Sequence, residues 1–131
     1  MGSEDLDLSS LNRAVSQLEK AYAHPPKSEL ERDGAVQRFE YTFELCRKMM
    51  RRHLELMGEQ DVDRWTVKDL FREAAVGGLI EDPRSWFKYQ ETRNITIHNH
   101  DEHKAEAAFR TGKDFVLDAR RFLDELLQRH A

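Results

Sequence analysis

The sequence contains a single cysteine, no long apolar run and no excess of basic residues, and each shortage excludes a class of protein. Cys46 alone cannot form an intramolecular disulfide, so we expect a reducing, cytoplasmic setting and a buried, inert thiol. No stretch approaches the roughly 18 apolar residues that span a bilayer, and the acidic N-terminal residues lack a signal-peptide pattern. We therefore expect a soluble protein with no membrane partner.

Charge balance and chain length limit the partners and the architecture further. The formal net charge is -4, from 21 basic and 25 acidic side chains, so a nucleic acid would have to be met by a local basic patch. The 131 residues suffice for one hydrophobic core but not for a second independent domain, which predicts a single domain over residues 1–131. Charged residues make up 35% of the chain and accompany apolar residues at helical spacing, which indicates solvated helix faces.

Apolar residues recur at three- and four-residue spacing in four segments, the pattern of helices that bury one face. These stripes cover residues 8–22, 36–57, 67–74 and 105–126. The first is followed by Pro25-Pro26, which cannot continue a helix. Ser28 and Glu31 predict a capping box before the second stripe, and Gly58 predicts its C-terminal cap.

The third stripe is shorter, with Thr66 and Asp69 at its head and two glycines, residues 77–78, at its end. A further helix is predicted to begin at residues 82–83, because Asp caps a helix and Pro fits its first position. Residues 99–102 should end that helix and start the last one. No segment alternates with a period of two. The sequence therefore predicts an all-α antiparallel bundle of four long helices and one short helix.

The helix that begins near residue 83 carries the pattern Arg93-Asn94-x-x-x-His98 near its end. Asn94 and His98 are one turn apart and share a helix face. Arg93 lies about 140° around the axis and about 7.5 Å along it from His98. The two side chains can serve one small group if the last turn unwinds, if Arg93 curls round, or if two copies of the helix face each other. A dimer with two motifs in one cleft meets this requirement most simply.

The residue types of this motif suit a phosphodiester substrate. A histidine near its ordinary pKa can take or give a proton at neutral pH, and a guanidinium offers a fork of donors to a phosphate oxygen. The alternative is that Arg93 pairs with a carboxylate and that His98 is a capping or core histidine. Spacing alone favours this second, structural interpretation.

Other polar residues near the motif give weaker signals. Basic residues on two helices could steer a phosphate backbone, although acidic residues lie between them: Arg84, Lys88, Lys104, Arg110 and Lys113. His98, His100 and His103 could hold a transition metal, but a solvated helix junction explains them as well. We therefore assign no metal site and no cofactor. His53 lies on an apolar stripe and is predicted to be a hydrogen-bonded core histidine.

Three segments resemble known proteins. Arg93-Asn94-x-x-x-His98 resembles the R-[N/D/H]-x-x-x-H signature of HEPN proteins, which also lies near the end of a late helix. Residues 37–45, QRFEYTFEL, are similar to the second-helix signature of the nucleotidyltransferase substrate-binding family. Residues 78–82, GLIED, followed by Trp86, are similar to that family's turn before the motif helix. The resemblance to this family of HEPN-class helical bundles covers nearly the whole chain.

The resemblance implies a homodimer that partners a minimal nucleotidyltransferase, in a pair of the toxin–antitoxin type. It also implies metal-independent cleavage of RNA, in which Arg93 polarises the scissile phosphate, His98 is the general acid or base, and Asn94 orients the histidine or the substrate. Lys88 and His100 are assigned to substrate binding. A rival interpretation is a non-catalytic subunit that holds a nucleotide or substrate for the transferase. A third is a helical adaptor whose motif is idle.

One position departs from the family pattern. Toxin-type relatives carry a tyrosine two residues after the motif histidine, and the transferase silences them by adding nucleotides to it. Here that position is His100, so addition to a phenol cannot occur there. Silencing would then work by binding alone or through another acceptor such as Tyr89, unless the chain is not a toxin.

Overall fold

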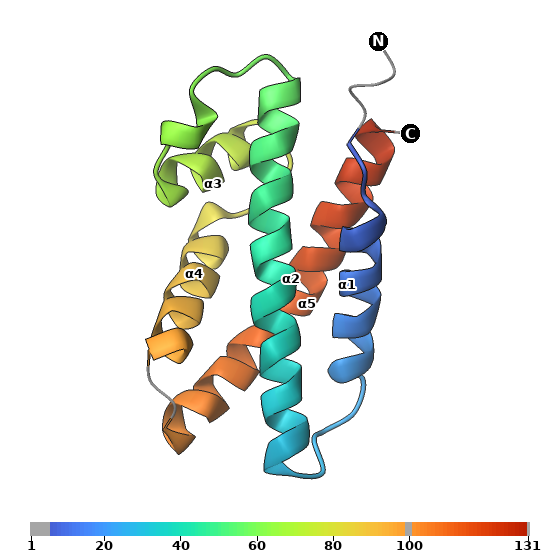
Figure 1. The fold of residues 1–131 in the computed structure, drawn as a ribbon, viewed down its shortest axis with the longest axis vertical. Helices are drawn as coiled ribbons and strands as arrows, with labels where there is room; N and C mark the ends of the chain where they lie inside the picture. The colour runs from blue at the N-terminus through green and yellow to red at the C-terminus, as the bar shows by residue number, and fades with distance from the viewer. Residues whose placement is uncertain (1–5, 99–100, 131) are drawn as a thin grey trace.

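The computed structural model describes residues 6–98 and 101–130, and its regular elements are all helices (Figure 1). They are α1 (Ser9–Ala21), α2 (Glu29–Leu56), the 3-10 helix η2 (Val62–Arg64), α3 (Val67–Val76), α4 (Pro83–His98) and α5 (Glu102–Arg129). The described ranges contain no strand, and none of their helices is long and apolar enough to cross a bilayer. The predicted all-α fold is confirmed.

The helices run up and down around a central pair (Figure 1). Helices α2 and α5, each 28 residues long, pack against each other. Helix α1 covers one side of this pair, and α4 covers the other with the short α3 above it. Consecutive long helices are antiparallel, so the end of α4 lies at the same end of the bundle as the start of α5.

Side-chain caps begin three of the helices at the predicted places. Ser28, Thr66 and Asp101 occupy the N-cap positions of α2, α3 and α5, and each side-chain oxygen accepts a backbone N–H three residues on, at 3.1, 3.1 and 2.9 Å. The Ser28 cap is half a capping box, because the Glu31 carboxylate accepts the N–H of Lys27 (3.0 Å) rather than that of Ser28.

Glycines end two helices at the predicted places. Gly58 and Gly78 adopt φ values of 96° and 79°, in the left-handed region that a Cβ disfavours. At each turn the following N–H reaches back to the helix, from Glu59 to the carbonyl of Leu54 (3.0 Å) and from Leu79 to a carbonyl of α3 (2.8 Å). These turns let the chain reverse after α2 and after α3.

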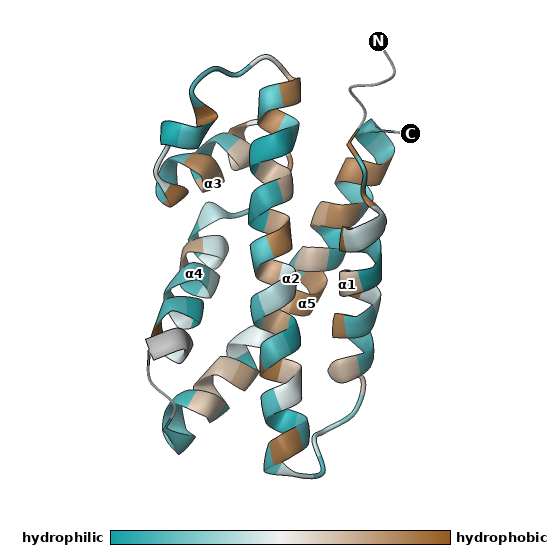
Figure 2. Ribbon diagram, viewed as in Figure 1, coloured by the Kyte–Doolittle hydropathy of each residue, from teal (hydrophilic) through white to brown (hydrophobic). Residues whose placement is uncertain are grey.

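The centre of the core is a cluster of aromatic rings where α2, α3, α4 and α5 meet, and Leu11, Val15 and Leu18 of α1 extend it. Hydrophobic residues recur between hydrophilic ones along α2, α3 and α5 (Figure 2). The largest fully buried rings are Trp86, Phe39, Phe43, Phe71, Phe115 and Phe122. Most neighbouring pairs are tilted or edge-on, with ring centroids about 5–6 Å apart, as aromatic electrostatics favours. Cys46 is fully buried as predicted, and burial raises the pKa of its thiol.

His53 is the predicted core histidine, and it fastens the end of α5. It is 2% exposed, and its Nδ1 lies 2.8 Å from Nε2 of His130, so that one ring donates a hydrogen bond to the other. Beside it, Arg129 Nη2 donates to the carbonyl of Gly77 (2.8 Å). The last turn of α5 is thereby tied to α2 and to the turn after α3. Burial, followed by the nearby His130 and Arg129, lowers the pKa of His53.

Helix α5 approaches α1 closely at Gly112. A Cβ at Gly112 would lie 2.1 Å from Tyr22 Oη and 3.1 Å from Phe39 Cβ. The Tyr22 ring stacks on Phe109 with centroids 4.8 Å apart. Its hydroxyl is buried without a hydrogen-bond partner among the residues described, and burial raises its pKa. Packing against Tyr22 therefore requires glycine in the middle of this helix.

The lowered pKa of His53 predicts a stability that falls in acid. The unfolded chain takes up the proton first as the pH drops below about 6.5, so the stabilisation is complete above that pH and is lost as the pH falls towards the folded pKa. Urea unfolding from about pH 8 to about pH 5 should show a smaller decrease in the free energy of unfolding for His53→Gln than for the wild type. His24→Gln, an exposed control, should follow the wild type. Equal pH slopes for all three proteins would contradict this.

A matched pair of glycine substitutions tests the close packing of α5. Gly112→Ala should lower the free energy of unfolding by about 1–3 kcal/mol, because the clash outweighs the better helix propensity of alanine. Gly34→Ala, at an exposed position of α2 with no atom within 4 Å of the new Cβ, should raise it by about 0.5–1 kcal/mol. Thermal or urea unfolding measures both. Stabilisation by both substitutions would disprove the packing constraint.

Candidate functional site

The predicted motif lies on the last turns of α4, which is helical through His98. Arg93 and Asn94 have described side chains, whereas those of residues 97 and 98 are not described, and residues 99–100 lie outside the described ranges. The roles predicted for the imidazoles of His98 and His100 therefore stay predictions. The geometry of the site is built from Arg93, Asn94 and what they contact.

Arg93 points from α4 towards α2, where its guanidinium meets Glu44. Nη2 of Arg93 lies 3.2 Å from Oε2 of Glu44, and the two side chains are 21% and 24% exposed. The contact has the distance of an ion pair but not the alignment of a hydrogen bond, and Arg93 Nε is buried with no hydrogen-bond partner among the described residues. Arg93 therefore pairs with a carboxylate, as one of the two interpretations of the sequence predicted. Its Nε donor has no partner among the described residues.

Glu44 holds a second arginine as well. Its Oε1 accepts a hydrogen bond from Arg47 Nη2 at 2.8 Å, one turn along α2. Glu44, Arg47 and Arg93 form what we call the Glu44 cluster, in which two guanidiniums share one carboxylate. The cluster therefore carries a formal charge of about +1 on a chain whose formal net charge is -4. This is a local surplus of positive charge of the kind that an anionic group can neutralise.

Gln90 connects the Glu44 cluster to Asn94. Its Oε1 accepts from Arg47 Nη1 at 3.3 Å, and its Nε2 donates to Asn94 Oδ1 at 3.1 Å. Gln90 and Asn94 are four residues apart on one face of α4, where such pairs meet. The exposed Asn94 is thus oriented by a chain of hydrogen bonds that begins on α2.

Thr96 fixes how α4 lies against α2. It is buried, and its hydroxyl oxygen lies within hydrogen-bond distance of two acceptors, the Glu40 carboxylate and the carbonyl oxygen of Arg93 (3.0 Å). Glu40 precedes Glu44 by one turn of α2, so two carboxylates in a row bind α4. These two contacts add to the packing of α4 on α3 and α5, which buries Trp86 and Tyr89.

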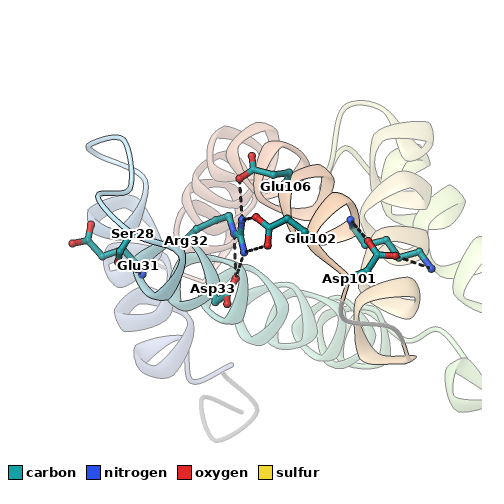
Figure 3. Close-up of polar contacts among 8 residues, drawn as sticks. Ser28, Glu31, Arg32, Asp33, Asp101, Glu102 and Glu106 are labelled. Atoms are coloured by element: carbon teal, nitrogen blue, oxygen red, sulfur yellow. Dashed lines mark hydrogen bonds and ion pairs between the residues drawn. The ribbon is translucent and has the colours of Figure 1, made fainter.

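A third arginine, Arg32, holds the start of α5 against α2 (Figure 3). Arg32 of α2 is 5% exposed and donates to Glu102 and Glu106 of α5 (3.0 Å for the latter) and to Asp33 (3.1 Å). Its guanidinium lowers the pKa of the Glu102 carboxyl. A cavity of about 290 Å³ lies beside it, and the lining side chains include Asp101 and Glu102. The start of α5 is therefore held against α2 by charge.

The structure places the remaining predicted residues apart from this network. Lys88 is exposed on α4, and six residues of helix put it about 120° around the axis from Asn94. Tyr89 is 3% exposed, and its hydroxyl donates a hydrogen bond to Asp118. Burial, followed by this hydrogen bond, raises the pKa of the Tyr89 phenol. A buried, hydrogen-bonded phenol is not accessible, so Tyr89 is unsuited to be the alternative acceptor of nucleotides. Among the side chains described, no three of His, Cys, Asp or Glu are grouped to hold a metal ion.

Sequence reasoning did not identify the α2 half of the site. Glu40 and Glu44 lie in the segment that carries the family resemblance, yet no role followed from their type alone. The signal was their spacing, because Glu40, Glu44 and Arg47 recur at four and three residues. Such spacing marks a polar stripe along one side of a helix whose other side is apolar.

Comparisons with known proteins agree on one family. The family model described as nucleotidyltransferase substrate binding protein like matches residues 6–128. The probable ribonuclease HepT of Haemophilus influenzae is 39% identical over 99 residues, which are 74% of this chain and 68% of the relative.

Solved structures show the same fold. A Haemophilus influenzae structure, described as the fold of a substrate binding domain of a nucleotidyltransferase, matches with a TM-score of 0.83 at 32% identity and covers 93% of this chain and 100% of that one. A crystal structure from Thermus thermophilus matches with a TM-score of 0.78 at 31% identity, over 88% of this chain and 98% of that one.

A double-mutant cycle tests whether the contact between Glu44 and Arg93 is energetically real. Glu44→Gln and Arg93→Gln should show a coupling of about 1 kcal/mol in the free energy of unfolding, because the pair is mostly shielded from water. The exposed pair of Asp69 and Arg72, whose charged atoms are 3.8 Å apart, is the control and should couple by less than about 0.5 kcal/mol. Equal coupling in the two cycles would show that the Glu44 contact is incidental.

Proposed function

The chain belongs to the nucleotidyltransferase substrate-binding protein-like family, and on that premise we propose that it is a metal-independent endoribonuclease that works as a homodimer. The resemblance drawn from residues 37–45 and 93–98 is confirmed at the level of the family. The similarity to a probable ribonuclease supports the proposed activity. The observation that carries the proposal is the Glu44 cluster, which provides a surplus guanidinium beside Asn94.

The Glu44 cluster lets Arg93 bind a phosphate at small cost. If Arg93 turns to a scissile phosphate, Glu44 keeps its 2.8 Å hydrogen bond to Arg47 and is not left as an unpaired, half-buried charge. The Nε of Arg93, which has no partner among the described residues, adds a donor for a phosphate oxygen. In this proposal His98 transfers the proton to or from the reacting oxygen, Asn94 orients the histidine or the substrate, and no metal is required.

A homodimer is the arrangement that suits these roles. Because α4 is helical through His98, the last turn is not unwound, and Arg93 and His98 remain about 140° apart around the axis. Two motif helices that face each other would let Arg93 of one copy and His98 of the other serve one phosphate. Lys88 and His100 would then contact the flanking RNA in the same cleft.

We further propose a minimal nucleotidyltransferase as the partner, in a cytoplasmic pair of the toxin–antitoxin type. The family's description supports a nucleotidyltransferase connection. Since the tyrosine position holds His100 and Tyr89 is buried, silencing would work by binding rather than by nucleotide addition to either position.

A non-catalytic binding subunit is the second candidate. The pairing of Arg93 with Glu44 favours it, because a guanidinium held by a carboxylate could bind a ligand through its remaining donors without stabilising the charge that develops during cleavage. In that case calorimetry would detect nucleotide binding while RNA stays intact.

Cleavage assays decide between the two. The wild type should cut single-stranded RNA in EDTA and leave cyclic-phosphate ends. His98→Ala should slow cleavage roughly 100- to 10,000-fold because a general acid or base is lost, and Arg93→Ala roughly 100- to 1,000-fold because charge stabilisation is lost. The rates come from fluorescent oligonucleotide assays.

Matched controls make the same substitutions, arginine to alanine and histidine to alanine, at positions outside the motif. Arg13→Ala on α1 and His24→Ala in the turn after α1 remove an exposed arginine and an exposed histidine far from α4, and both should cleave at the wild-type rate. If His98→Ala cut RNA as fast as His24→Ala, the ribonuclease proposal would be lost and the binding subunit would remain.

A further inference from the structure

A groove between α3 and α4 runs beside the motif. It has a volume of about 590 Å³, and its lining includes the apolar side chains of Val67, Phe71 and Phe87 and the amides of Gln90 and Asn94. Phe87 is half-buried, so part of its ring faces the groove. The combination of an aromatic wall with amide groups is suited to a flat, polar-edged ring.

The groove follows one face of α4 towards the motif histidine. Phe87, Gln90 and Asn94 recur at three and four residues, so they form one continuous stripe. His98 occupies the next position of that stripe along the backbone, one turn after Asn94. The Glu44 cluster lies on the other side of Gln90. A nucleotide could therefore place its base in the groove and its phosphate near Arg93.

Arg47 determines which way the amides of Gln90 and Asn94 point. A guanidinium only donates hydrogen bonds, so the atom of Gln90 that meets Arg47 is Oε1. The other end of the same amide, Nε2, only donates, so the atom of Asn94 that meets it is Oδ1. Gln90 thus engages the oxygen of Asn94 and leaves its NH₂ group as the end that faces a ligand.

Resting on the proposed function, we propose that this groove binds the nucleobase next to the scissile phosphate. We propose also that Gln90, by orienting Asn94, selects bases that carry a carbonyl at C4 of a pyrimidine or C6 of a purine. Uracil and guanine present an oxygen acceptor at this position, whereas cytosine and adenine present an NH₂ donor. The Asn94 NH₂ group donates to the oxygen of uracil or guanine and has no acceptor to meet in cytosine or adenine. Gln90 is then a positioning residue for specificity, and the base stacks on Phe87.

The flat surfaces and amides of the groove fit a nucleobase. Lys68 and Glu91 contribute one cation and one carboxylate to its lining. Outside the lining, Arg72 lies over the Phe87 ring at 5.7 Å from its centroid and 3.8 Å from the Asp69 carboxylate. A base that stacks on this face of Phe87 would take the place of the Arg72 guanidinium, whose exposed side chain can move aside. An aromatic face with two amides favours a nucleobase over an acidic peptide segment that carries no flat ring.

The test measures binding of four probes, the 3′-monophosphates of uridine, cytidine, guanosine and adenosine. Wild-type protein should bind the uridine and guanosine probes about 3- to 10-fold more tightly than the other two, as one hydrogen bond gained against one unmet predicts. NMR should show the side-chain amide of Asn94 shifting with each probe.

Gln90→Glu should reverse the preference. A glutamate still accepts from Arg47 but cannot donate to Asn94, so Asn94 turns its NH₂ to the carboxylate and its oxygen to the groove. The double variant Gln90→Glu with Glu91→Gln restores the charge of the groove and should keep the reversed preference. Asn94→Asp, which accepts from Gln90 and has no NH₂, should lose the preference for carbonyl bases.

The outcomes separate this inference from the ribonuclease proposal. Reversal in both Gln90 variants supports the subsite, and it does so even if no variant cleaves RNA. If Gln90→Glu lowered the affinity for all four probes equally, and the double variant restored it, then only the charge of the groove would matter. That result would overturn the proposed base selection. An Asn94 amide that no probe shifts would also overturn it, even if the wild type cleaves RNA.

Discussion

The seam between α2 and α4 depends on Glu44, a single carboxylate between two guanidiniums. The first half of α4 is fixed by Trp86 and Tyr89, which are buried where α4 packs on α3 and α5. The second half is more polar, and there contacts from α2 add to this packing, through Glu44 to Arg93 and through Glu40 to the buried hydroxyl of Thr96. Because the same contacts hold Arg93 and orient Asn94, one row of α2 residues supports both the packing of α4 and the proposed site.

Much of the fold could be predicted because local signals and burial agree along the chain. Ser28, Thr66 and Asp101 cap helices where their side chains predicted starts, and Gly58 ends α2 with a positive φ. These features act within a few residues of themselves, so sequence alone reveals them. The tight contact at Gly112 could not be predicted, because the tyrosine that demands it lies far away in the sequence.

The site was predicted only on the helix that carries the motif. The pattern of Arg93 and Asn94 marks a candidate site, but Glu44, which pairs with Arg93, comes from a helix about 50 residues earlier, a separation that no local pattern encodes. Tyr89 shows the same limit. Its type made it a candidate acceptor, and only the packing of α4 on α5 reveals that its hydroxyl is buried and bound to Asp118.

Two arginines, Arg32 of α2 and Arg93 of α4, differ in the number of carboxylates around the guanidinium. Arg32 donates to three carboxylates and is nearly fully buried, so it has little capacity left for a ligand. Arg93 has part of one carboxylate, shared with Arg47, and retains a donor without a described partner. In the proposed function, an anion at Arg93 would compete with fewer carboxylates than at Arg32, where Glu102 and its neighbours hold the guanidinium. A chain with a net negative charge can hold an anionic substrate in this way, since the pairing around each cation decides where positive charge is available.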